Sequence, residues 1–112
     1  MRLLLRLFAE CHDEADAHEL MALICRSIPG VMPTPAESPA RYWKMPELFE
    51  FCIECGRADP GAFEALRNLQ PLGWVDGGDD DDRSSVWNRA EKWRFLDDAV
   101  VWAELQLSAQ AP

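Results

Sequence analysis

The stretch that decides the fold is Leu48–Cys55, with the sequence Leu-Phe-Glu-Phe-Cys-Ile-Glu-Cys. Side chains of an extended chain point alternately to its two faces. One face of this stretch is apolar and is formed by Phe49, Phe51, Ile53 and Cys55. The other face is formed by Glu50, Cys52 and Glu54. This period of two predicts a β-strand with one buried face and one face in contact with water.

The same alternation recurs near both ends of the chain. In residues 2–9 the predicted inward side chains are Leu3, Leu5, Leu7 and Ala9. The opposite face holds Arg6 and Phe8, an amphipathic pattern that is typical of a central strand or a covered patch. In residues 99–108 the predicted inward side chains are Val101, Ala103, Leu105 and Leu107. The predicted outward face includes Val100, Trp102 and Glu104, which makes the tryptophan a candidate exposed ring.

Two helices are predicted between these strands. The first begins at the N-cap Asp13 and ends at Ile28, before a Pro-Gly pair. Its apolar stripe consists of Ala17, Leu20, Met21, Ile24 and Ile28. The second begins at the N-cap Asp59, with a proline at the first helical position, and ends before Pro71. Both patterns have the spacing of an amphipathic helix that packs one face on a sheet.

Weaker patterns predict the remaining elements. Residues 29–39 are rich in proline and predict a surface connection without periodicity. Residues 40–45 predict a strand that forms a hairpin with Leu48–Cys55. Residues 73–85 predict an exposed loop, because its five aspartates repel one another. A short strand is predicted at 86–89 and an irregular segment at 91–98.

The predicted order is strand, helix, two strands, helix, then one or two strands. This order predicts an α+β fold of the ferredoxin-like type, a split βαβ sandwich. Right-handed crossovers would place both helices on one face of an antiparallel sheet. The length of 112 residues fits one domain over residues 1–108, with residues 109–112 as a frayed tail.

Net charge limits the classes of partner. The chain carries a formal charge of −9 with 48% hydrophobic residues, so it has material for a core and an acidic surface. Nucleic acid and anionic membranes attract basic patches, so we expect neither as a partner. The negative charge of this chain is compatible with a basic protein partner. The acidic residues could equally serve only to keep the protein soluble. Arg6 and Glu10 interrupt the N-terminal apolar run, so we expect no signal peptide and a cytoplasmic protein with reduced thiols.

No residue pattern predicts catalysis, a metal or a cofactor. Cys52 and Cys55 lie three apart within a predicted strand, so their side chains point to opposite faces and cannot easily share a zinc ion. The pair is also not at a helix N-terminus, where a redox thiol would have a lowered pKa. No serine has a Gly-x-Ser-x-Gly context. We therefore expect a protein that is not an enzyme, with catalysis through His12 or a cysteine as an alternative.

Two features favour an interface. Asp79, Asp80, Asp81 and Asp82 form a dense acidic run, which we interpret as an element that steers a basic partner. A solvated loop tip and a calcium loop are the other interpretations; the calcium loop lacks its glycine. Downstream of this run lie Trp87, Arg89 and Trp93, residue types that favour interface hot spots, although they also complete small cores.

Three further features are the acidic segment 76–82, the sequence Val86-Trp-Asn-Arg and the ending Val100-Val-Trp-Ala-Glu-Leu-Gln-Leu. With these features and its small size, the chain resembles the immunity proteins of bacterial polymorphic toxin systems. The resemblance implies a cytoplasmic protein that binds one toxin domain and blocks its basic active site. The alternative is a ferredoxin-like domain that binds a small molecule or regulates another protein. An exposed sheet edge would allow either protein to form oligomers.

Overall fold

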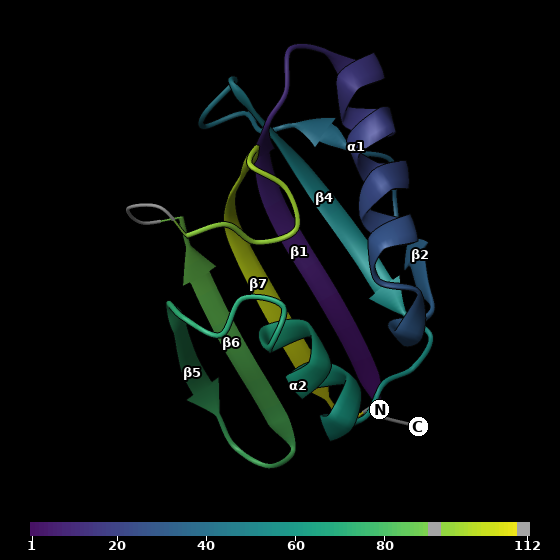
Figure 1. Ribbon diagram of the computed structural model, residues 1–112, viewed down its shortest axis with the longest axis vertical. Coiled ribbons are helices and arrows are strands. Elements are labelled where there is room, and N and C mark those ends of the chain that lie inside the picture. The colour runs from purple at the N-terminus through teal and green to yellow at the C-terminus, as the bar shows by residue number, and fades with distance from the viewer. Residues whose placement is uncertain (90–92, 110–112) are drawn as a thin grey trace.

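The computed structural model describes residues 1–89 and 93–109, which form one antiparallel sheet and two helices (Figure 1). The elements are β1 (Arg2–Glu10), α1 (Glu14–Ser27), a 3₁₀ turn (Pro29–Val31), β2 (Pro33–Pro35), β3 (Ala40–Arg41), β4 (Leu48–Cys55), α2 (Pro60–Arg67), β5 (Trp74–Gly78), β6 (Asp82–Asn88) and β7 (Val100–Ser108). The strand order is β2-β4-β1-β7-β6-β5, and the short β3 also pairs with β4.

The central strands follow the predicted alternation. β1 pairs with β4 on one side and with β7 on the other. The apolar side chains predicted to face inward from β1 and β4 are buried, namely Leu3, Leu5, Leu7, Ala9, Phe49, Phe51, Ile53 and Cys55. These residues form one core with the apolar stripes of both helices. The prediction for the organising strand is confirmed.

Both helices cover the same face of the sheet and leave the other face without a helix (Figure 1). Each begins at its predicted cap: Asp13 Oδ1 accepts from Asp16 N–H at 2.9 Å, and Asp59 Oδ1 accepts from Ala62 N–H at 2.7 Å. These carboxylates satisfy backbone donors that the first helical turn leaves unpaired. The side of the sheet opposite the helices is called the open face below.

The α+β class is confirmed, but the sheet has seven strands and the ferredoxin-like arrangement is not confirmed. The segment 29–39, predicted to lack strands, contains β2. Pro33 and Pro35 are tolerated there because β2 pairs only with β4 and lies at the sheet edge. The strand predicted over 40–45 is limited to Ala40–Arg41.

The segment 73–85, predicted to be a loop, is largely a hairpin of β5 and β6. Asp82 already belongs to β6, so only the turn between the two strands is irregular. A second correction concerns β7, where Val100 rather than Val101 is buried. Phe8 pairs with Trp102 and Ala9 pairs with Val100, so Val101 is an extra residue in a β-bulge. The bulge reverses which of the two valines faces the core.

Candidate functional site

The acidic residues predicted to steer a partner lie at the tip of the β5–β6 hairpin. Asp79 Oδ1 accepts from the backbone N–H groups of Asp81 at 2.9 Å and Asp82 at 3.0 Å, which shapes the tip. All four residues from Asp79 to Asp82 are exposed. Within the described residues, no arginine, lysine or histidine forms a salt bridge with any of them. The structure therefore places four exposed aspartates around the turn between β5 and β6, which lies at one end of the sheet (Figure 1).

Asp76 has a different environment from the tip aspartates. Its Oδ1 accepts from the hydroxyl of Ser85 at 2.6 Å, and its Oδ2 binds Nη2 of Arg67 at 3.0 Å. Arg67 also binds Glu64, which in turn binds Arg83. This network joins α2 to the hairpin, so the carboxylate of Asp76 serves the fold rather than a partner.

The residues predicted as anchors do not form one surface with the aspartates. Trp87 is 0% exposed, and its Nε1 donates to the carbonyl of Leu72 at 3.1 Å. It cannot touch a partner while the core is intact, so its predicted role is withdrawn. Its large ring and its place on an alternating strand favoured burial as much as contact.

Arg89 and Trp93 lie at the opposite end of β6 from the aspartate tip. Seven residues of β6 separate the two ends, which corresponds to about 20 Å. Arg89 is already engaged, because Nη2 binds Glu10 Oε1 at 2.6 Å and Nη1 donates to the carbonyl of Asp98 at 2.6 Å. Trp93 is half-buried over Gly73, where a Cβ atom would lie 2.7 Å from the ring. Both residues contribute mainly to the structure of this end of the sheet.

The open face contains a row of aromatic rings that was not identified as a group from the sequence. We call Trp102, Phe8, Tyr42 and Trp43 the aromatic row. The ring centroids of Phe8 lie 5.1 Å from Trp102 and 4.5 Å from Tyr42, and Tyr42 lies 6.4 Å from Trp43. The signal available in the sequence was Phe8 on the second face of its strand and Trp102 on the outward face of the last strand.

Two cations lie against these rings. The guanidinium of Arg6 is 5.1 Å from the Phe8 centroid and 5.6 Å from the Trp102 centroid, and it forms an ion pair with Glu50. The ammonium of Lys44 is 5.1 Å from the Trp43 centroid. These cation–π contacts hold the rings and cations in a defined arrangement on the open face.

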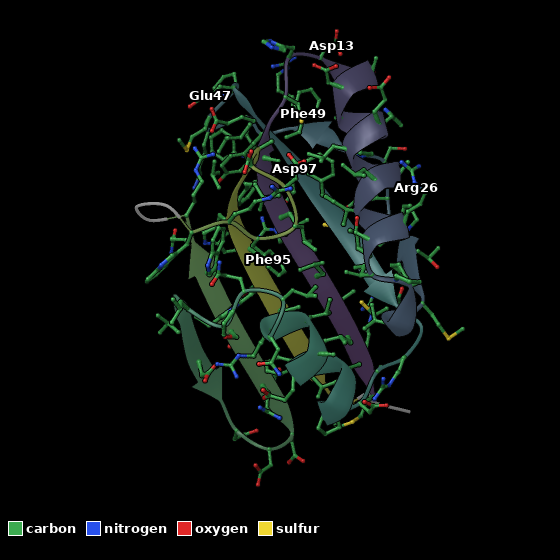
Figure 2. The ribbon with its side chains drawn as sticks, viewed as in Figure 1. Asp13, Arg26, Glu47, Phe49, Phe95 and Asp97 are labelled. Atoms are coloured by element: carbon green, nitrogen blue, oxygen red, sulfur yellow. The ribbon has the colours of Figure 1, made fainter. Side chains whose placement is uncertain are left out.

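A groove of about 550 Å³ lies on the helix side, where the end of β1 meets α1 and the segment 97–99. Its polar lining includes Glu10, Cys11, His12, Asp16 and Asp97. Figure 2 shows Asp13 near the start of α1 and Asp97 in the segment that crosses in front of the sheet. Burial raises the pKa of the Cys11 thiol, and the nearby carboxylates raise it further. The thiol is therefore a poor nucleophile at neutral pH.

The cysteines of β4 point to opposite faces, as their spacing predicts. Cys55 is buried on the helix side, whereas Cys52 is half-buried on the open face. Burial raises the pKa of both thiols to about 11, with a hydrogen bond to Glu37 adding to the effect at Cys52. Over residues 1–89 and 93–109, no cluster of three or more histidine, cysteine or acidic side chains could hold a metal ion.

No family model, curated protein or solved structure matches this chain. In the part of the chain that the structure describes, no helix has both the length and the apolar character needed to cross a membrane.

Proposed function

We propose that this chain is an immunity-type binding protein that neutralises a basic toxin domain in the cytoplasm by covering its active site. The observation that supports this function most directly is the aspartate tip, where four exposed carboxylates have no cationic partner among the described residues. On a chain with a formal charge of −9, these groups give one end of the molecule a concentrated negative potential.

The position of the tip suits electrostatic steering. It lies at one end of the sheet, where β5 turns into β6, and on the far side of the sheet from α1 (Figure 1). A charge cluster attracts an opposite charge over about one Debye length, roughly 8–10 Å in ordinary buffers. A toxin that acts on nucleic acid or nucleotides has a basic cleft for its substrate. An acidic hairpin tip fits such a cleft and would accelerate the approach of the two proteins.

The first experiment tests neutralisation itself. The probe is the C-terminal domain of a large secreted protein encoded by a neighbouring gene, produced in bacteria with and without this chain. We expect the domain alone to arrest growth and the pair to grow normally and co-purify. Growth arrest that this chain fails to relieve, or the absence of a toxic neighbour, would remove the toxin proposal.

The second experiment tests the tip. Replacing Asp79, Asp80, Asp81 and Asp82 by asparagine should slow association on the order of tenfold at low ionic strength and flatten its salt dependence. The matched control changes the same number of exposed acidic residues elsewhere: Glu14→Gln, Glu19→Gln, Glu37→Gln and Asp98→Asn. Stopped-flow association rates measure both. Equal rates for the two variants would show that net charge matters and the tip does not.

A second candidate is a ferredoxin-like domain that binds a small molecule or regulates another protein. The strand order β2-β4-β1-β7 supports a ferredoxin-like core to which the β5–β6 hairpin is added. The groove beside Cys11 has a volume of about 550 Å³, within the range of ligand sites. A rise in melting temperature with a defined metabolite panel, together with no toxin partner, would favour this function.

A further inference from the structure

We infer that the aromatic row is the docking surface that gives affinity for the basic partner, apart from the aspartate tip that steers it. This inference depends on the proposed function and adds to it the place and chemistry of the main contact. The partner surface that fits is one with aliphatic side chains flanked by lysine or arginine. We expect Trp43 to contribute most to binding, because it is the most exposed of the four rings.

The fold does not require the exposed end of the aromatic row. The hydrophobic core lies between the sheet and the helices, whereas Phe8 and Trp102 alternate with core residues on their strands and so face the open side, where Tyr42 packs on Phe8. Trp43 is 79% exposed, and its one aromatic neighbour among the described residues is Tyr42. Met45, 46% exposed, adds to the apolar area of the same loop. Trp43 is the most exposed large apolar side chain of the described residues, and aromatic residues and methionine are enriched at protein interfaces.

The aromatic row is also held in place before any partner arrives. The regular register of β1 and β7 sets Trp102 opposite Phe8, and the β-bulge at Val101 follows directly after this pair. Arg6 contacts both of these rings and is itself fixed by Glu50. Rings that are already ordered lose little conformational entropy on binding, so more of their burial contributes to affinity.

Charge on the open face favours a basic protein over a second copy of this chain. The strand residues that share this face include two arginines, Arg2 and Arg6, and four acidic residues, Asp82, Glu50, Glu54 and Glu104. Glu54 and Glu50 pair with these two arginines, which leaves Glu104 and Asp82 without a salt bridge among the described residues, against one cation, Lys44, beside Trp43. Glu104 lies in register between Arg6 and Val86, close to the aromatic row. Two copies, each with a charge of −9, would repel one another across such a surface.

The experiment uses a photo-crosslinking phenylalanine derivative at one position at a time in the full chain, in its native cells. Position 43 tests the aromatic row and position 80 tests the tip. Position 69 is the matched control, because Leu69 is also apolar and 51% exposed but follows α2 on the helix side. We expect position 43 to crosslink one basic polypeptide and position 69 to crosslink none. The crosslinked protein is then purified and used for binding measurements.

Affinities of the purified pair complete the test. Trp43→Ala should weaken binding about 30-fold, as expected for a hot-spot tryptophan, while Leu69→Ala changes it less than threefold. Trp43→Phe should restore part of the loss. Melting temperatures should stay equal, since Trp43 is exposed in the free protein.

The crosslinking results distinguish failure of the docking surface from failure of the proposed function. A basic partner that crosslinks from position 80 or 69 but not from 43 overturns the docking surface and leaves the proposed function standing. A crosslink from 43 to a second copy of this chain overturns the basic occupant. Finding no basic polypeptide from any of the three positions counts against both the docking surface and the proposed function.

Discussion

Replacing Asp76 by alanine tests whether the aspartates of the hairpin have two separate roles. This carboxylate accepts from the Ser85 hydroxyl and binds Arg67, whereas Asp80 at the tip has no side-chain partner among the described residues. Ser85 is 0% exposed, so without Asp76 its hydroxyl would lose its acceptor in a place that water does not reach. We therefore expect loss of the Asp76 side chain to destabilise the protein and loss of the Asp80 side chain to leave its stability nearly unchanged.

The magnitude follows from the two contacts. A buried hydroxyl left without its acceptor costs about 1–3 kcal/mol. The ion pair with Arg67 adds about 0.5 kcal/mol, because the Asp76 side chain is 59% exposed and solvent screens the pair. We expect Asp76→Ala to lower the free energy of unfolding by about 2 kcal/mol, or the melting temperature by about 8 °C. Asp80→Ala should change the free energy by less than about 0.5 kcal/mol.

Urea denaturation followed by circular dichroism measures these differences. Asp76→Asn is the graded control: the amide oxygen can still accept from Ser85, but the charge opposite Arg67 is gone. It should recover more than half of the loss caused by alanine. Equal stabilities of the Asp76→Ala and Asp80→Ala proteins would refute the assignment of Asp76 to the network between α2 and the hairpin.

Three further predictions concern reactivity, pH and fluorescence. Burial raises the pKa of Cys52 and Cys55 to about 11, so on the order of 0.1% of each thiol is ionised at pH 8. Both should therefore react with a disulfide reagent on the order of 100-fold more slowly in the folded than in the urea-unfolded protein. Equal rates in the two states would contradict the burial of these thiols. The pKa of Asp59 is lowered chiefly by the Arg57 side chain and then by Ala62 N–H, so its stabilisation is present above the unfolded value of about 3.9 and is lost as pH falls through the lower folded value. Asp59→Asn should therefore flatten the loss of stability between about pH 4 and 2 in urea titrations, and an unchanged pH profile would exclude this carboxylate as a cause. Trp43→Ala should remove a large part of the fluorescence that acrylamide quenches in the folded protein, whereas quenching unchanged by the substitution would place the ring out of solvent.

The sequence predicted the elements whose signals are local. A period of two identified β1, β4 and β7, and caps identified where each helix begins, because alternation and N-capping are set by neighbouring residues. The sequence did not predict β5, because Trp-Val-Asp-Gly-Gly contains residues that favour turns. Such residues are tolerated in an edge strand that pairs with one neighbouring strand. Pairing with β6 overrides the weak local preference there.

The candidate site was also hard to predict, because it depends on strand pairing and not on local sequence. Trp87 and Trp102 both lie on strands, and only the pairing shows that one faces the core and the other the open face. The bulge at Val101 depends on the match between β1 and β7, which no local pattern of β7 reveals. The aromatic row brings Phe8 into contact with Trp102, which lies 94 positions later in the sequence, so its existence depends on topology.

The separation between the aspartate tip and the aromatic row determines how the two surfaces can act together. Trp102 lies six residues along β7 from Ser108, which pairs with Asp82, so about 20 Å separates the row from the tip. That distance exceeds the Debye length in physiological salt, so the tip acts on the approach of a partner more than on the bound contacts at the row. Loss of the tip charges should then lower the association rate, and loss of Trp43 should raise the dissociation rate. Because sites this far apart contribute independently, the combined variant should show both changes with little coupling between them; a large coupling energy would mean that tip and row contact the partner as one surface.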